Sequence, residues 1–195
     1  MSPITHFLVS WAIAGTSGLK RRERAAVALA GIAPDLDGLG IVPELLTRGS
    51  AHPLLWFTEY HHVLGHNIGF ALLVTIAGFI FARADKWKTA VLVFVSFHLH
   101  LLCDVIGARG PDGYQWPIPY LLPFSHRSDI VWHGQWALNA WQNFAITGIG
   151  LIVMFWIARN KGFSPLEIVS EKADAAFVKT IRARFPLTIS RAATT

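Results

Sequence analysis

The chain has 195 residues, of which 53% are hydrophobic and 15% charged, with a mean hydropathy of +0.43 and eight tryptophans. This composition is too apolar for an ordinary soluble domain and is typical of an integral membrane protein. The net charge of +5 comes with no nucleic-acid-binding motif, so no nucleic-acid partner is expected, and the single cysteine, Cys103, excludes an internal disulfide.

Two short apolar segments begin the chain, at residues 7–19 and 25–33. We interpret both as half-buried or partly spanning helices. The other interpretation of the first segment is a signal peptide. No basic residue precedes its apolar stretch, whereas Lys20 and Arg21 follow it, so we expect the segment to be retained.

Three longer apolar segments follow, at residues 67–82, 89–108 and 139–158. The last contains no charge and has the length that crosses a hydrocarbon core of roughly 30 Å. We therefore predict an all-α fold: residues 1–158 form a polytopic membrane helical bundle of about five membrane-embedded helices.

The remaining residues, 159–195, are polar and basic and are predicted to form a separate cytoplasmic tail. A capping box with proline at the first helical position is present at residues 164–167. Apolar residues then recur every four positions, at Val169, Ala173, Phe177 and Ile181. This pattern predicts an amphipathic helix that lies on membrane lipids or docks on a partner protein.

Basic residues are distributed unevenly between the two sides of the predicted bundle. If the chain changes sides at each predicted helix, Arg48, Arg109 and Arg127 lie on one side and the other 14 of the 17 basic residues on the opposite side. The positive-inside rule makes the second side cytoplasmic.

Ionisable residues of the types that bind metals interrupt this apolar chain in five places. They are His6, the pair Asp35 and Asp37, the run His61, His62 and His66, the pair His98 and His100, and Asp104. Unpaired ionisable groups in apolar surroundings are costly, and metal binding explains them most simply. Under the predicted topology these residues all lie at the non-cytoplasmic face, which indicates one site at the outer end of the bundle.

The spacing within each cluster leaves alternatives open. His100 and Asp104, four residues apart, share a helix face and can bind one ion, or they can bond to each other in a helix interface. Asp35 and Asp37 lie in a turn between Pro34 and Gly38 that can chelate an ion or simply be solvated.

The histidine run has two possible pairings. On a continuous helix His62 and His66 share a face, whereas a helix break at Gly65 would let His61 and His66 converge. Helical geometry by itself favours His62 with His66. A single histidine such as His6 is more often a capping or interfacial residue than a ligand.

The loop at residues 109–136 is rich in proline and tryptophan. Such a stiff aromatic segment at the headgroup level suits either a lid over a lipid or membrane-adjacent substrate or a structural interfacial belt.

Taken in order, these motifs resemble a known family. Thr5-His6, Pro34-Asp35-Leu36-Asp37, His61 with His66, and His100 to Asp104 followed by Trp116-Pro117 look like the bacterial YdjM-type family of membrane-bound predicted metal-dependent hydrolases, which is remotely similar to zinc-dependent phospholipase C. The resemblance covers about the first 125 residues. His61-His62 and Gly65-His66 stand where the family has His-Arg and Thr-His.

The resemblance implies a set of ligands and a chemistry. The metal ligands it implies are His6, Asp35, Asp37, His61, His66, His100 and Asp104, with Asp37 and Asp104 also catalytic. It favours His61 over His62, against the helical geometry. It further implies one to three Zn²⁺ ions, or other divalent metals, and water activated to hydrolyse a phosphoester or lipid-like substrate. The protein would be a multi-pass protein of the bacterial inner membrane with its site facing the periplasm.

A second class of function is also consistent with the sequence. The same ligands would serve a non-catalytic membrane metal-binding or metal-transport protein, or a metal that only stabilises the fold. The inner halves of the predicted helices carry almost no polar residues that could continue an ion path, which favours a site confined to one end. Oligomeric state is not indicated by any pattern.

Overall fold

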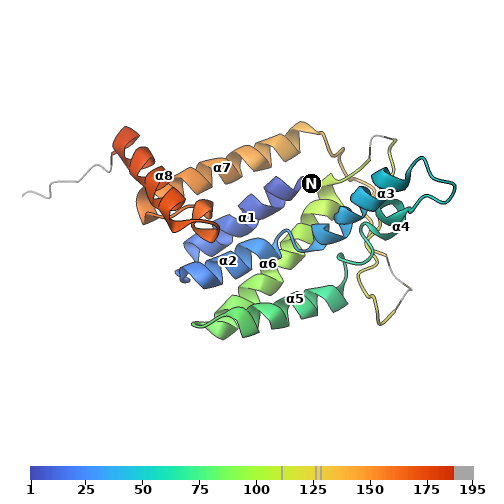
Figure 1. Ribbon diagram of the computed structural model, residues 1–195, viewed down its shortest axis with the longest axis horizontal. Helices are drawn as coiled ribbons and strands as arrows, with labels where there is room; N and C mark the ends of the chain where they lie inside the picture. The colour runs from blue at the N-terminus through green and yellow to red at the C-terminus, as the bar shows by residue number, and fades with distance from the viewer. Residues whose placement is uncertain (111, 126, 128, 187–195) are drawn as a thin grey trace, which may run out of the picture.

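The computed structural model describes residues 1–110, 112–125, 127 and 129–186, and within them the regular secondary structure is helical apart from two isolated β-bridges. Five helices pack side by side: α1 (Pro3–Thr16), α2 (Arg21–Ala30), α5 (Ile68–Phe81), α6 (Lys86–Gly107) and α7 (Trp141–Lys161). α1 contacts α2, α6 and α7, while α6 contacts α2 and α5, so α5 and α7 form opposite edges of the bundle (Figure 1). The predicted all-α fold is confirmed.

Local sequence signals explain where these helices begin and end. The Ser2 side chain accepts a hydrogen bond from Thr5 N and Pro3 follows it, while Asn67 caps α5 by accepting from Phe70 N. α7 ends at Gly162, whose φ of 83° requires glycine. α6 begins before the predicted residue 89, and α7 continues beyond the predicted residue 158. In both cases the helix includes charged residues that flank the apolar segment.

The expected five membrane-embedded helices are not confirmed. In the described part of the chain, α6 and α7 are long and apolar enough to cross a membrane. α2 together with η1 (Pro34–Gly40) and α3 (Ile41–Thr47), bent by 57°, provides at most a third span. α1 and α5, at 14 residues each, are shorter than the ~20 residues that a straight span needs.

The core lies between the helices, and large apolar side chains also cover the outside of the bundle. Trp11, Ala28 and Ile157 are fully buried where α1, α2 and α7 meet. On the outer faces, Ile80 of α5 is 71% exposed and Phe144 of α7 is 69% exposed. Apolar exposure on this scale marks a surface that contacts lipid.

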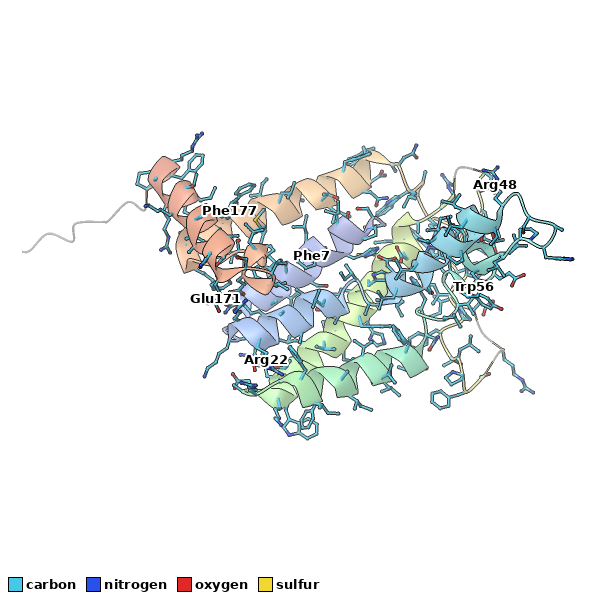
Figure 2. All side chains as sticks on the ribbon, in the orientation of Figure 1. Phe7, Arg22, Arg48, Trp56, Glu171 and Phe177 are labelled. Atoms are coloured by element: carbon cyan, nitrogen blue, oxygen red, sulfur yellow. The ribbon has the colours of Figure 1, made fainter. Side chains whose placement is uncertain are left out.

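One end of the bundle is basic and is closed by the C-terminal segment. Arg24 of α2 forms a two-point ion pair with Glu167 of η2 (Pro165–Ile168), at 2.7 and 2.6 Å. Arg21 pairs with Glu171 at the start of α8 (Glu171–Arg184), which lies across this end of the bundle (Figures 1 and 2). The C-terminal segment is thereby attached to α2 as well as to α7.

The predicted amphipathic helix is present but begins later than the capping box indicated. Ser164 caps only the short η2 turn, and its backbone N and Oγ donate to Asp174 rather than pairing with Glu167. α8 has its own cap at Ser170. Val169 lies before the helix and is 86% exposed, and Ala173 is also exposed, whereas the buried residues of α8 are Asp174 and Val178.

The other end of the bundle is built from short elements and loops. η1, α3 and α4 (Trp56–Tyr60) gather there, next to the start of α1 (Figure 1). Asn143 at the start of α7 attaches the loop that follows α6: its side-chain amide donates to Gly107 O and Leu138 O, and its Oδ1 accepts from Trp136. The histidine and aspartate clusters lie at this end.

Candidate metal centre

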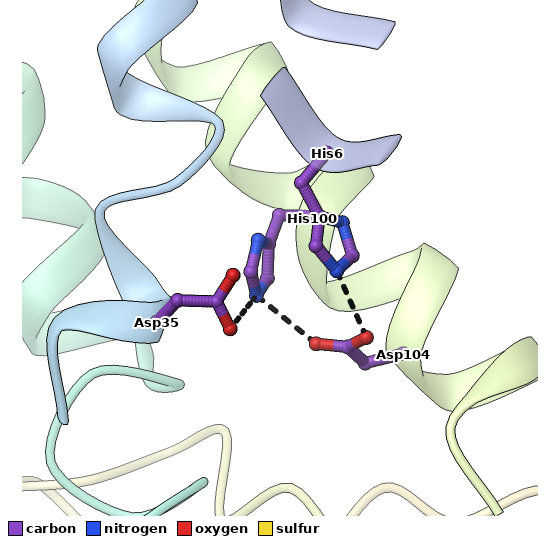
Figure 3. A group of neighbouring side chains, drawn as sticks. All are labelled: His6, Asp35, His100 and Asp104. Carbon is purple, nitrogen blue, oxygen red and sulfur yellow. Dashed lines mark ion pairs between the residues drawn. The ribbon is translucent and has the colours of Figure 1, made fainter. Parts of the chain in front are cut away.

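Three elements bring a first group of four candidate ligands together: His6, Asp35, His100 and Asp104, which offer ligand atoms within 4.8 Å of one another (Figure 3). α6 presents His100 and Asp104 one turn apart, with Nε2 3.0 Å from Oδ2. His6 of α1 places Nε2 3.1 Å from Asp104 Oδ1, and Asp35 of η1 lies 3.7 Å from His100 Nε2. All but Asp35 are at most 2% exposed.

A second group consists of His62, His66 and Asp104, all buried. His66 Nε2 lies 3.5 Å from Asp104 Oδ2 and 3.2 Å from His100 Nε2. Asp104 belongs to both groups, so its carboxylate links them. Residues from four separate segments of the chain therefore converge, as the sequence predicted.

The loop that carries the histidine run is not helical. His62 has a φ of 67°, in the left-handed region that residues other than glycine rarely adopt. Gly65 crosses the η1 turn so closely that a Cβ atom there would overlap the Pro34 carbonyl oxygen. This tight crossing, and not a shared helix face, brings His62 and His66 to Asp104.

Asp37 and His61 lie outside both groups. The Asp37 side chain is 2% exposed and accepts three hydrogen bonds, from His61 Nδ1 at 2.8 Å, Gly65 N at 2.9 Å and His66 Nδ1 at 3.0 Å. A carboxylate on Nδ1 fixes the orientation of a histidine whose Nε2 faces the ligand position. In this geometry Asp37 aims His66 at Asp104.

His100 is oriented in the same way by the backbone. Its Nδ1 donates to Gly31 O at 2.8 Å, so the Nε2 atoms of His66 and His100 face each other at 3.2 Å. Two bare nitrogen lone pairs repel at that distance, so a proton or a cation must lie between them.

The pKa values of His66 and His62 indicate that a proton lies between the two Nε2 atoms when no metal is bound. Burial opposes the charge of His66, but its interactions with Asp104 and Asp37 outweigh burial and raise its pKa to about 9. Burial and the neighbouring charge of His66 lower the pKa of His62 to about 2. The metal-free centre thus holds a proton on His66 that a metal ion has to displace.

Several buried polar atoms support a cation at this place. His6 Nδ1, Asp35 Oδ2 and His62 Nδ1 have no hydrogen-bond partner among the described residues. The Met1 amine also contacts Asp104. Buried polar groups without partners are rare in native proteins. Imidazole nitrogens and carboxylate oxygens together form a donor set that fits a divalent metal.

A pocket of about 770 Å³ borders the two groups. Asp35, His62 and Asp104 lie on its wall, together with apolar and aromatic side chains and one basic residue, Arg109. Trp116 packs against the His62 ring at 5.0 Å between centroids, at the edge of the pocket. The pocket continues to Phe144 of α7, so one wall belongs to a candidate membrane span.

One residue at the centre has no motif in the sequence. Gln135, 1% exposed, donates to the backbone carbonyls of Asp104 and Val105 from the loop that follows α6. It holds the part of α6 that presents Asp104. No spacing or periodicity marks this glutamine, because the contact exists only after the loop folds back.

The other histidines lie away from the two groups. His98 bonds to Phe94 O and to the Tyr120 hydroxyl, and His133 bonds to Gln115. Neither they nor His52 belong to either group. His126 lies outside the described residues.

Comparison with known proteins identifies the family. Curated proteins and solved structures give no significant match. A family model described as YdjM inner membrane protein matches residues 1–169, which include both groups and the candidate membrane spans. The chain therefore belongs to the YdjM inner membrane protein family.

Proposed function

We propose that this protein is an integral membrane, metal-dependent hydrolase that acts on a phosphoester or lipid-like substrate. The observation that carries the proposal is the pair of His/Asp groups that share Asp104 and border an open pocket. Two adjacent ions beside a substrate cavity are the arrangement of many phosphoester-hydrolysing enzymes. A metal that only stabilised the fold would need no such pocket.

Two Zn²⁺ ions fit the donors best. His6, Asp35, His100 and Asp104 supply the four ligands of a tetrahedral zinc site. The second group supplies three, the number that leaves a position open in catalytic zinc sites. Other divalent metals that accept imidazole and carboxylate are the alternative.

When bound, the ions supply Lewis acidity and activate water for attack on the substrate. The chain's own residues hold this arrangement in place. Asp37 and the Gly31 carbonyl each bind an Nδ1 atom and so keep the Nε2 atoms of His66 and His100 directed inward. His61 shares the Asp37 carboxylate and lines the pocket, where it is placed to contact substrate.

The pocket favours a substrate with a phosphate and an apolar part. Arg109 lines it, and its guanidinium has no ion pair or hydrogen bond with the described residues. The planar fork of arginine matches phosphate oxygens. Phe57, Leu138 and Phe144 provide apolar walls, and Phe144 stands on a candidate membrane span.

The distribution of charge supports an orientation with the pocket facing the periplasm. The opposite end of the bundle carries Arg21, Arg24 and the basic α8. Basic residues beside membrane spans remain cytoplasmic.

Metal content is the first test. Purified wild-type protein should hold about two zinc ions per chain under non-chelating conditions, one for each group. Asp104→Ala should lose both ions and His66→Ala one, because only Asp104 belongs to both groups. His52→Ala, at an exposed position outside the groups, is the control. Wild-type protein without stoichiometric metal would contradict the proposal.

Turnover is the second test. The metal-loaded protein should cleave a chromogenic phosphodiester or a phospholipid in mixed micelles, and Asp104→Ala should not. A protein that retains its metal but cleaves neither substrate would favour the non-catalytic metal-binding or metal-transport function. Unfolding of the bundle by a chelator would favour a purely structural metal.

A further inference from the structure

At the basic end of the bundle, far from the metal groups, a second hollow of about 830 Å³ lies between α7 and α8. Its α7 side is formed by Ile152, Phe155, Trp156 and Arg159, which follow one helix face. Its α8 side is formed by Ile181, Arg184 and Phe185. We call this hollow the α7–α8 groove.

Specific contacts hold the two helices together at the edge of the groove. Arg182 Nε donates to Arg159 O at 2.9 Å, and the Arg159 guanidinium donates to the carbonyls of Phe185 and Pro186 at 2.8 and 2.7 Å. The groove walls stay open, since Trp156 is 50% exposed and Ile152 is 69% exposed. The groove is therefore an apolar surface with a fixed shape.

The charge along this groove is entirely positive. The acidic residues of the C-terminal segment are engaged elsewhere: Glu167 with Arg24, Glu171 with Arg21, and Asp174 with Ser164. Arg184 has no ion pair among the described residues. An apolar channel that ends at an unpaired arginine is complementary to an amphiphile with an anionic head.

We propose that the α7–α8 groove binds one anionic phospholipid from the leaflet at the basic end of the bundle. An acyl chain lies along Ile152 and Trp156 of α7, and the phosphate accepts hydrogen bonds from Arg184. From Ile152 to Arg159 the helix rises about 10 Å, so the groove runs from the headgroup level into the acyl region of one leaflet. The site is independent of the metal centre and of any hydrolase activity.

Native mass spectrometry of the purified full-length protein tests the assignment. The protein is incubated in detergent micelles with dioleoylphosphatidylglycerol or with dioleoylphosphatidylcholine. We expect the anionic lipid to be retained in preference to the zwitterionic one, at one molecule per chain. Arg184→Gln should weaken its binding about fivefold, the effect of one basic residue on an anionic lipid.

Lys179→Gln is the matched control, because it removes the same charge from an exposed position of the same helix outside the groove. It should leave binding unchanged. Phosphatidylglycerol with brominated acyl chains should quench the tryptophan fluorescence of the wild-type protein. This quenching should decrease in Trp156→Phe, which lacks the groove tryptophan.

Three results would overturn the proposal. Equal losses in Arg184→Gln and Lys179→Gln would indicate diffuse attraction of lipid to α8. Equal retention of both lipids would show that the groove does not select a lipid by the net charge of its headgroup. A dimer that forms without bound lipid and dissociates in Arg184→Gln would assign the groove to a second copy of the chain.

Discussion

The Asp37 carboxylate offers the sharpest test of how the centre is built. It receives hydrogen bonds from two histidine Nδ1 atoms and from Gly65 N, all in a buried position. Asp37→Ala removes the acceptor for all three donors. Loss of a group that orients a metal ligand lowers metal affinity about 10- to 100-fold. The buried N–H groups left without partners should lower the free energy of unfolding of the metal-free protein by about 3 kcal/mol.

Asp37→Asn should be milder, for a geometric reason. The asparagine oxygen can occupy the Oδ2 position, which serves Gly65 N and His66, while the amide nitrogen faces His61. His61 can change tautomer to accept from it, whereas a backbone N–H cannot change. We expect this variant to keep zinc stoichiometry and to lose only about tenfold in affinity, because a neutral amide raises the basicity of the His66 ligand less than a carboxylate does.

Zinc affinity can be measured by competition with a chromophoric chelator, and stability by thermal unfolding in detergent with and without zinc. Asp129→Ala, an exposed aspartate in the outer loop, is the control and should match wild type. If Asp37→Ala keeps wild-type affinity, Asp37 does not orient a ligand. If Ala and Asn variants both lose one zinc ion per chain while remaining folded, Asp37 is itself a ligand, as the family resemblance implied.

Three further predictions concern the loop, the basic end and pH. Gly65→Ala should lower both Tm and zinc content, because its Cβ would overlap the backbone of the η1 turn; wild-type values for both would show that the loop can move away. Arg24→Gln should lower the free energy of unfolding by about 3 kcal/mol, because it leaves Glu167 buried and uncompensated, whereas Arg21→Gln at an exposed pair should change it by less than about 1 kcal/mol. Equal effects of these two variants would contradict the prediction that the buried Arg24–Glu167 pair contributes more to stability than the exposed Arg21–Glu171 pair. For the metal-free protein, the raised His66 pKa means that its stabilising charge is present below pH 6.5 and is lost as the pH rises through about 9. Tm should therefore fall over that interval while zinc affinity rises, and a Tm that rises without zinc would refute the assignment.

The all-α fold class could be predicted from the sequence, but the number of membrane-spanning helices could not. Apolar runs identified α5, α6 and α7 closely, because a long apolar stretch in a membrane protein has few structures other than a helix. Hydropathy predicted α1 and α2 as short helices of the bundle, but it left open whether they are half-buried or partly spanning. Their length depends on where the chain turns, at Ser17 and Gly31, and on which neighbours bury them.

The C-terminal segment shows the same limit. A capping box is a local signal, but Glu167 contributes more by pairing with Arg24 of another helix than by bonding back to Ser164. The box therefore produced only a short turn. A helix in this segment was predicted, but its buried residues, Asp174 and Val178, do not belong to the predicted apolar repeat.

The sequence alone determined the membrane character of this protein, its basic end and the presence of His and Asp clusters at the opposite end. Each follows from composition or from spacing along the chain. Tertiary structure alone decided how the clusters combine. It joined two groups through Asp104 and placed His62 in the second group, whereas Asp37 lies behind His66. The reason is that a backbone crossing, where Gly65 passes the η1 turn, sets these directions, and sequence spacing carries no record of contacts between distant segments.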